Sequence, residues 1–219
     1  MPTMYLSDRY ALETAGARDL IDANGRATIV TEGSDGLRAT YGFFMLEPAT
    51  GDGDITVIGH IARADPQVQD LGAGGEALLI FDGPHGYISA SWYAPTLTNV
   101  PGTWNYSAVH LRGVPEPLPV ESALDVVRRT VERHESRLPA DQRWSLTGEA
   151  LDFARKIVPG TFAFRLAATH VEAKAKLSQE MPAEIQHNVE QQLRQPGAHA
   201  NTALADSMAS QSAVRDRAL

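Results

Sequence analysis

The segment "GHIARADPQ", residues 59–67, places three side chains capable of chemistry within a few positions: His60, Arg63 and Asp65. It directly follows the apolar run "DITVI", which is typical of a buried strand. A neutral imidazole can ligate a metal ion, and a guanidinium can hold a carboxylate or phosphate through two parallel hydrogen bonds. His60 equally fits a histidine packed at the rim of a core, and Arg63 fits a pairing with Asp65. Spacing alone leaves both interpretations open.

Local sequence offers no metal site built from several protein ligands. The histidines show no HxH, HxxxH or HExxH spacing, and the chain contains no cysteine. One imidazole is enough where a macrocycle supplies the other ligands, as in haem. His60 is therefore the candidate metal ligand, because the strand before it is apolar and the segment after it is polar.

Two further segments carry groups suited to a cofactor pocket. The stretch at 91–106, "SWYAPTLTNVPGTWNY", contains Trp92, Tyr93, Trp104 and Tyr106, whose flat faces and polar edges suit a planar ring. A hydrophobic cluster at the end of a barrel explains these aromatic residues equally well.

The segment "KAKLSQ" carries Lys174 and Lys176 near the end of a predicted strand. Lysines two apart on a strand point to the same side, so they could form a small positive pocket. A solvated strand end is the alternative.

Composition limits the class of protein. With 219 residues the chain fits one domain with extra helices or a tail, and its net charge of −8 argues against a nucleic-acid-binding surface. The absence of cysteine excludes disulfides, thiolate metal sites and a cysteine nucleophile. No apolar stretch approaches the roughly 20 residues of a membrane span, and the first residues lack the pattern of a signal peptide. We therefore expect a cytoplasmic protein.

Hydrophobic periodicity predicts a mainly β fold with flanking helices (α+β) and an antiparallel barrel. Helices are expected over 8–23, 121–138, 148–158 and 183–194, and strands over 26–32, 37–47, 55–62, 76–82, 86–93, 103–114 and 161–174. The domain spans residues 1–180, with helices inserted around 121–158. Residues 181–219 form a C-terminal helix and a weakly patterned tail that orders only if it packs on something.

Several segments together resemble the PaiB-like proteins, FMN-binding negative transcriptional regulators. The matching segments, in the order of that family, are "MYLSDRY", "GHIARADPQ", "EALLIFDGPHGYISASWY", "NVPGTWNY" and "KAKLSQE", and they span roughly residues 4–180. The resemblance implies a split β-barrel of the FMN-binding/flavin-reductase type. It also implies a homodimer with cofactor sites at the subunit interface.

The chain departs from that family at segments that face the pocket. An His-Pro pair after the first helix is replaced by Ala23-Asn24, and a His-Leu-Pro-like stretch in the second strand by Tyr41-Gly42-Phe43. Asp65 and Val68 stand where the family usually has Asn and Trp, and Gly102 is inserted within VPTWNY. One branch of the family, the piperazate synthases of natural-product biosynthesis, has exchanged flavin for haem.

The resemblance to that branch implies haem b in place of FMN and N5-hydroxy-L-ornithine as substrate, cyclised to L-piperazic acid. His60 would be the axial ligand, and Arg63, Lys174 or Lys176 would hold the substrate carboxylate or the haem propionates. The proton-moving and cofactor-lining residues would be Tyr87, Tyr93, Tyr106, Trp92, Trp104, Ser178 and Gln179.

Two other functions stay open. The first is a PaiB-like FMN-binding regulator or flavoprotein, and the second is a split-barrel enzyme that degrades haem or reduces flavin. Because the chain is acidic and shows no basic recognition helix, we expect no direct contact with nucleic acid.

Overall fold

The computed structural model describes residues 4–49, 51 and 53–217, with side chains up to residue 211. The chain forms two compact units. Unit 1 comprises residues 1–17, 82–109 and 172–219, and unit 2 comprises residues 18–81 and 110–171.

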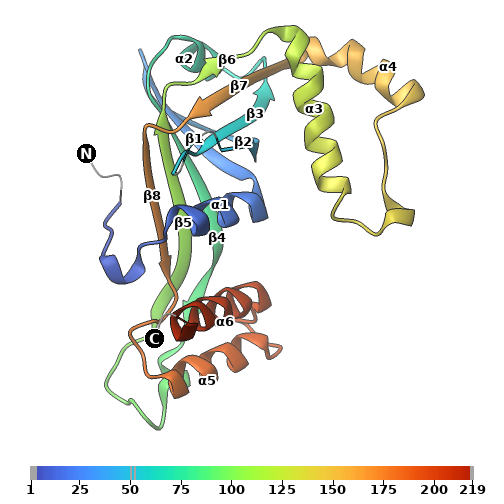
Figure 1. Cartoon of the computed structure of the whole chain (residues 1–219). Helices are drawn as coiled ribbons and strands as arrows, with labels where there is room; N and C mark the ends of the chain where they lie inside the picture. The colour runs from blue at the N-terminus through green and yellow to red at the C-terminus, as the bar shows by residue number, and fades with distance from the viewer. Residues whose placement is uncertain (1–3, 50, 52, 218–219) are drawn as a thin grey trace. The chain divides into compact units, whose positions relative to one another are not determined.

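Within the described residues, the strands form one sheet in the order β6-β7-β3-β2-β1-β4-β5-β8 (Figure 1). Their bounds are β1 (Arg26–Gly33), β2 (Gly36–Leu46), β3 (Thr56–Ala62), β4 (Ala77–Ile88), β5 (Thr103–Gly113), β6 (Glu116–Pro117), β7 (Thr161–Ala167) and β8 (His170–Lys176). In unit 2, every neighbouring pair from β6 to β4 is antiparallel. The predicted mainly β architecture with flanking helices is confirmed.

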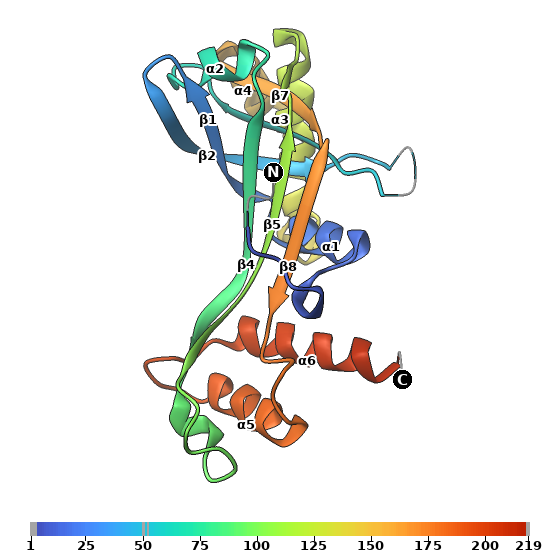
Figure 2. The ribbon, with the colours of Figure 1, turned by 90° about the vertical axis from the view of Figure 1, so that its left-hand side faces the viewer.

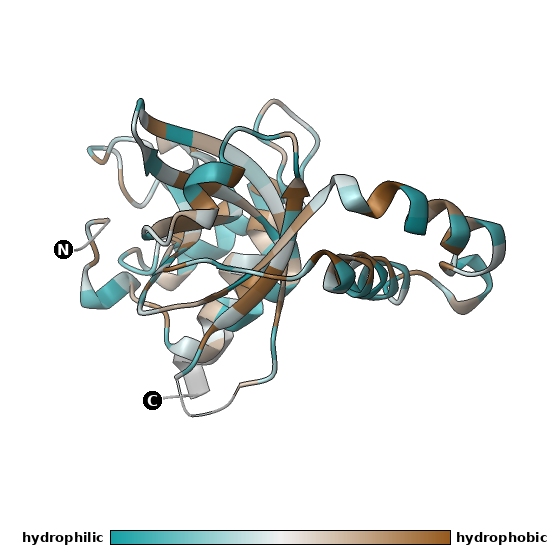
Figure 3. Cartoon of the chain, turned by 90° about the horizontal axis from the view of Figure 1, so that it is seen from above, coloured by the Kyte–Doolittle hydropathy of each residue, from teal (hydrophilic) through white to brown (hydrophobic). Residues whose placement is uncertain are grey.

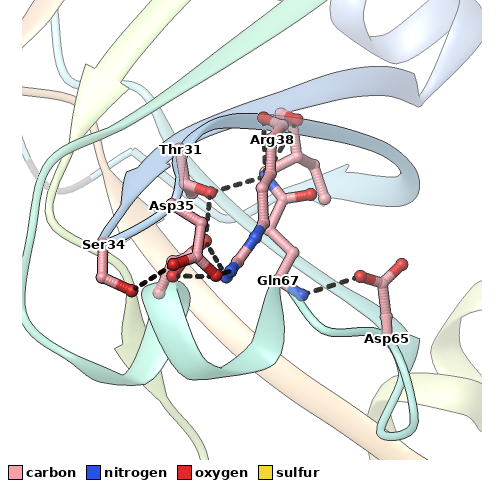
Figure 4. A network of polar contacts seen from close by, with 8 residues as sticks. Thr31, Ser34, Asp35, Arg38, Asp65 and Gln67 are labelled. Carbon is pink, nitrogen blue, oxygen red and sulfur yellow. Dashed lines mark hydrogen bonds and ion pairs between the residues drawn. The ribbon is translucent and has the colours of Figure 1, made fainter.

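The hairpin between β1 and β2 forms where the sequence predicts it. Gly33 and Gly36 are paired across the turn, and Gly36 has a φ of 102°, which favours glycine. Behind the turn, Arg38 Nη1 lies 2.9 Å from the carboxylate of Asp70 in helix α2 (Val68–Gly72). The buried Gln67 amide donates to the Thr31 hydroxyl at 2.9 Å (Figure 4). This network fixes the segment after "GHIARAD" to the hairpin.

Helix α3 (Val120–Glu135) covers one side of the unit 2 sheet. Its residues Ala123 and Val126 are buried against Met45, Ile58 and Ala163 of strands β2, β3 and β7. Figure 3 shows α3 and α4 (Gly148–Ile157) on the right, each with both brown and teal residues. The mixed colouring reflects the helical periodicity that predicts both helices.

An ion-pair network adds to the attachment of α3. The Glu47 carboxylate lies 2.8 Å from Arg129 on α3 and 3.0 Å from Arg165 on β7. Burial alone would raise the pKa of Glu47, but the hydrogen bonds from Arg129 and Arg165 lower it below its usual value. Glu47 is therefore ionised at neutral pH and links the helix to the sheet.

Unit 1 is completed by a helix pair at the C-terminal end of the chain. Helices α5 (Ala183–Arg194) and α6 (Thr202–Arg217) lie side by side in Figures 1 and 2. Their shared core consists of Ile185, Val189, Leu193, Leu204, Ala205 and Met208. The Asn201 side chain caps α6 by accepting a hydrogen bond from Leu204 N at 3.0 Å. The bounds predicted for α5 are confirmed, and the weakly patterned tail orders by packing on it.

Three predicted elements differ from the observed ones. The helix expected over 8–23 is a short 3-10 turn, η1 (Asp8–Tyr10), followed by α1 (Thr14–Asn24). The two are separated because Ala11 pairs with Lys174 and Leu12 N donates to Ala173 O at 2.9 Å. Ala11 and Leu12 are therefore extended beside β8. Pairing with this strand prevents the helix that their hydrophobic periodicity predicts.

The strands expected over 76–82 and 86–93 are one strand, β4, followed by the 3-10 turn η2 (Ala90–Tyr93). Pro84 is tolerated because β1 pairs with β4 only as far as Phe81. Conversely, the single strand expected over 161–174 divides into β7 and β8. The break lies at Ala168 and Thr169, whose N–H groups donate to Ile55 O and Arg112 O.

Among the described residues, none of the helices combines the length and apolar character required to cross a bilayer.

We predict that Gly59→Ala destabilises the protein by about 1–3 kcal/mol, the usual cost of overpacking. A Cβ at Gly59 would lie 2.3 Å from Phe43 O and 2.5 Å from the Phe44 ring. Gly75→Ala is the matched control, because nothing lies within 4 Å of the position that its added methyl group would occupy. Urea denaturation measures both changes, and equal stability of the two variants would contradict the close packing at Gly59.

Candidate functional site

His60 lies in the middle of the unit 2 sheet, on β3. It is directly opposite Phe43 of β2 on one side and Ala163 of β7 on the other. Because side chains alternate along a strand, His60 points to the same face as Ile58, which packs beneath α3. The neighbouring Gly59 points to the opposite face, toward the Phe44 ring. The register thus places the imidazole at the margin of the α3-covered core.

The imidazole of His60 is partly buried and chemically unsatisfied. Its Nδ1 atom is shielded from solvent and has no hydrogen-bond partner among the described residues. Burial lowers the pKa of His60 below its ordinary value, so the neutral form dominates at pH 7. Neutral imidazole is the form that ligates metal ions. The neutral imidazole therefore fits the metal ligand expected from the sequence through its other nitrogen, Nε2, because the shielded Nδ1 is out of reach of an iron that approaches from outside the fold.

An apolar strip on β2 begins at the residue opposite His60. It consists of Leu37, Tyr41 and Phe43, which are 76%, 59% and 51% exposed, and is called the β2 strip below. The Arg26 guanidinium lies over the Tyr41 ring, 4.1 Å from its centroid. Exposed apolar and aromatic surface beside a histidine is suited to the face of a planar ring such as a porphyrin or a flavin.

Arg63 does not form the ion pair with Asp65 that its spacing allows; its guanidinium binds backbone carbonyls instead. Its Nε donates to Pro159 O and its Nη2 to Thr161 O, both at 3.0 Å. Its guanidinium carbon lies 5.7 Å from the Phe162 ring centroid. Asp65 instead accepts a hydrogen bond from Gln67 N at 2.9 Å, as a turn-forming aspartate does. Arg63 therefore joins the end of β3 to the start of β7 and is not bound to any carboxylate in the described part of the chain.

The two lysines of β8 belong to unit 1 and contact different groups. Lys176 Nζ donates to Thr103 Oγ1 at 2.6 Å and to Trp104 O at 2.9 Å. Lys174 Nζ donates to Tyr5 O at 2.7 Å and lies 5.3 Å from the Tyr106 ring centroid. Both ammonium groups therefore face residues of β5, and each is held by a neutral oxygen.

Ser178 and Gln179 end the same segment with their polar groups engaged. Ser178 is fully buried at a φ of 65°, and its hydroxyl accepts from Asn105 Nδ2 at 2.9 Å. Gln179 donates to Ala175 O at 2.5 Å and accepts from Leu177 N at 2.6 Å. These contacts shape the end of β8, and a role for either residue in cofactor binding stays a prediction.

The remaining aromatic candidates also lie in unit 1. The Tyr87 ring centroid is 5.4 Å from that of His199, which is 6.2 Å from the Trp92 ring. Tyr93 is buried, and its hydroxyl has no hydrogen-bond partner among the described residues. Burial, and then the charges of Glu180 and Tyr87, raise the pKa of the Tyr93 phenol. Tyr93 therefore stays protonated at neutral pH.

The structure thus divides the predicted site residues between the two units. His60 and Arg63 lie in unit 2, whereas the tyrosines, tryptophans, lysines, Ser178 and Gln179 lie in unit 1. In the described residues, no group of three or more His, Cys, Asp or Glu side chains could hold a metal ion. A histidine in the described part of the chain could therefore hold a metal ion only where another molecule supplies most of the ligands, as haem does, and His60 is the histidine that the sequence predicts for this role.

Sequence reasoning missed the partners of these residues. Asn105, Tyr5 and Tyr10 lie within segments that carry the family resemblance, but the sequence alone assigned none of them a role in the site. Asn105 could have been found from the alternation of β5, because it occupies an inward position together with Ser107 and Val109. Tyr5 and Tyr10 could not, because their contacts with Lys174 join residues about 170 positions apart.

A family model with the description "Putative FMN-binding domain" matches residues 4–170. The chain belongs to the PaiB-like FMN-binding family. It is 33% identical over 139 residues to the "Protease synthase and sporulation protein PAI 2" of Bacillus subtilis, and the match covers 63% of this chain. It takes in 64% of that relative, so the chain spans less than two thirds of the relative's length.

Solved structures of similar fold include the FAD and haem binding protein of Mycobacterium smegmatis, with a TM-score of 0.56, 17% identity, and coverage of 82% of this chain and 79% of that one. The flavocytochrome Anf3 of Azotobacter vinelandii is similar at a TM-score of 0.56 and 15% identity, covering 80% of this chain and 74% of that one. At these identities the likeness shows the fold, and it confirms the split-barrel architecture of this PaiB-like protein.

We predict that His60 makes the protein without a bound cofactor less stable in acid. Folding lowers the pKa of His60, so the unfolded chain binds more protons than the folded one. The contribution of the neutral His60 to the free energy of unfolding is therefore complete above the unfolded pKa of about 6.5, and it is lost as the pH falls below that value. Unfolding free energies measured over roughly pH 5 to 8 should decrease more steeply on acidification in the wild type than in His60→Gln. Identical pH profiles would contradict a buried neutral His60.

Proposed function

We propose that this protein binds haem b through His60 and converts N5-hydroxy-L-ornithine to L-piperazic acid by forming an N–N bond. The observation that carries the proposal is the His60 imidazole, which is neutral and only partly buried, so that its Nε2 could bind an iron. The β2 strip beside it offers an apolar surface for the porphyrin face.

Similar proteins support a haem site on this fold. The M. smegmatis protein is described as binding both FAD and haem, and the A. vinelandii protein is described as a flavocytochrome. A split barrel can therefore accommodate either group. The side chain that distinguishes the two groups here is His60, since a flavin requires no axial imidazole.

The reaction loses one water and is redox-neutral, so it requires no external reductant. When bound, the haem iron supplies a Lewis-acidic centre that weakens the N–O bond of the hydroxylamine. The chain's own task is to bring the α-amine to N5 so that a six-membered ring can close. Holding both ends of a flexible amino acid in this geometry is where a protein contributes most to such a cyclisation.

Specific residues are available for that task. Arg63, Lys174 and Lys176 are the cations that could bind the substrate carboxylate or the propionates. Tyr87 and Tyr106 are partly exposed phenols that could donate a proton to the departing hydroxide, and Tyr93 is a buried, protonated one. The homodimer expected from the resemblance stays a prediction.

A second candidate function is an FMN-binding flavoprotein or regulator. It is favoured by the description of the matching family, whose named ligand is FMN. The same face of unit 2 that suits a porphyrin also suits an isoalloxazine ring. The net charge of −8 argues against direct DNA binding in the regulatory version of this function.

The absorption spectrum of the purified protein separates the two functions. We predict a Soret band that is lost or strongly shifted in His60→Ala, because the substitution would remove the imidazole proposed to hold the iron. His134→Ala is the matched control, since this exposed histidine lies on α3 and should leave the band unchanged. Flavin bands without a Soret band would overturn the haem proposal.

We further predict that the haem-loaded protein converts N5-hydroxy-L-ornithine to a product lighter by one water, detected by mass spectrometry. L-ornithine, which lacks the hydroxyl leaving group, should be recovered unchanged. Haem binding without this conversion would reject the cyclase activity while leaving the cofactor assignment intact.

A further inference from the structure

Lys174 lies in an unusual environment within unit 1. Its side chain is only 5% exposed, and its Nζ lies 5.3 Å from the ring centroids of Tyr5 and Tyr106 and 6.0 Å from that of Tyr10. Rings from the N-terminal segment and from β5 thus contact one buried ammonium. Tyrosine faces attract cations, but they provide no negative charge.

The hydrogen bonding of this ammonium is incomplete. A lysine ammonium has three donors, and Lys174 uses one of them, to the Tyr5 carbonyl. In the described part of the chain, no carboxylate lies within ion-pairing distance of Lys174 Nζ. Lys176, by contrast, donates to two oxygens. A buried cation is normally both paired and hydrogen-bonded, so Lys174 lacks the partner that its burial calls for.

Within the described residues, the one hydrogen-bond acceptor of Lys174 is the Tyr5 carbonyl oxygen, which belongs to the N-terminal segment. Residues Ala11 and Leu12 are paired with β8, but Tyr5, six residues earlier, is 80% exposed. Because most of the surface of Tyr5 is already exposed, moving its carbonyl away would uncover mainly the Lys174 ammonium. An oxyanion forms stronger hydrogen bonds with an ammonium than a neutral carbonyl does.

We propose that Lys174 is the receptor for a ligand oxyanion, a carboxylate or a phosphate, which replaces the Tyr5 carbonyl on the ammonium. The rings of Tyr10 and Tyr106 would shield the resulting ion pair from water. Arg63 is less suited to this role because two of its donors already bind backbone carbonyls.

The identities of the candidate ligands rest on the proposed function. The claim that Lys174 binds an oxyanion rests only on its burial and its hydrogen bonding. The anion could belong to the amino-acid substrate, as its carboxylate, or to the cofactor, as a haem propionate or an FMN phosphate. Three probe pairs distinguish these sources, each differing only in the acidic group. They are L-ornithine and putrescine, haem and its dimethyl ester, and FMN and riboflavin.

Isothermal titration calorimetry on the full chain tests the proposal. We expect the acidic member of at least one pair to bind more tightly than the member that lacks the acidic group. Lys174→Met should weaken binding of that acidic probe by about 10- to 100-fold, the range for a lost charge-assisted hydrogen bond. Binding of the probe that lacks the acidic group should be unaffected. Lys156→Met is the matched control, because this exposed lysine of α4 has no role in the proposed site, and it should retain the preference.

Each outcome has a defined meaning. A preference for ornithine assigns the oxyanion to the substrate, and a preference for haem or FMN assigns it to the cofactor. Equal binding within all three pairs, or unchanged affinities in Lys174→Met, would overturn the proposal. Circular dichroism checks folding, and Lys174→Gln replaces the methionine variant if that one unfolds. Failure of the cyclase activity alone leaves the ornithine and FMN comparisons valid.

Discussion

The candidate site depends on one constraint, the burial of the His60 imidazole in a sheet whose described residues offer its Nδ1 no partner. Burying a polar atom without a hydrogen bond costs free energy, and removing water from the ring favours its neutral form. The sheet imposes both conditions through register, since His60 is fixed between Phe43 and Ala163. A neutral, desolvated imidazole is poorly suited to the surface and well suited to a metal.

The departures from the usual PaiB-like sequence gain a physical meaning from this register. Phe43, in the stretch that replaces a His-Leu-Pro-like sequence, is the residue directly opposite His60. An apolar ring therefore borders the candidate ligand. The inserted Gly102 is required for space, because a Cβ there would lie 2.7 Å from the backbone oxygen of Ile88 and 2.3 Å from the Tyr87 hydroxyl. The two changes thus act separately, at the candidate ligand in unit 2 and beside Tyr87 in unit 1.

Sequence periodicity predicted the elements whose contacts are local. The hairpin at Gly33–Gly36 and helix α5 were predicted because turn chemistry and the spacing of Ile185, Val189 and Leu193 act within a few residues. The division of the N-terminal helix and the break between β7 and β8 were not, because partners distant in sequence decide both. His60 and Lys174 could be named as candidates from their residue types. That their polar groups lack hydrogen-bonding or charged partners can be recognised only from burial and hydrogen bonding in the fold.

Resonance Raman spectroscopy of the ferrous, haem-loaded protein tests the central claim most directly, because it observes the bond between iron and its axial nitrogen. The account predicts an iron–nitrogen stretching band that shifts when histidine is labelled with nitrogen-15. The band should be absent in His60→Ala and present in His134→Ala. An iron–nitrogen band that persists in His60→Ala would show that another residue holds the iron and would contradict the account.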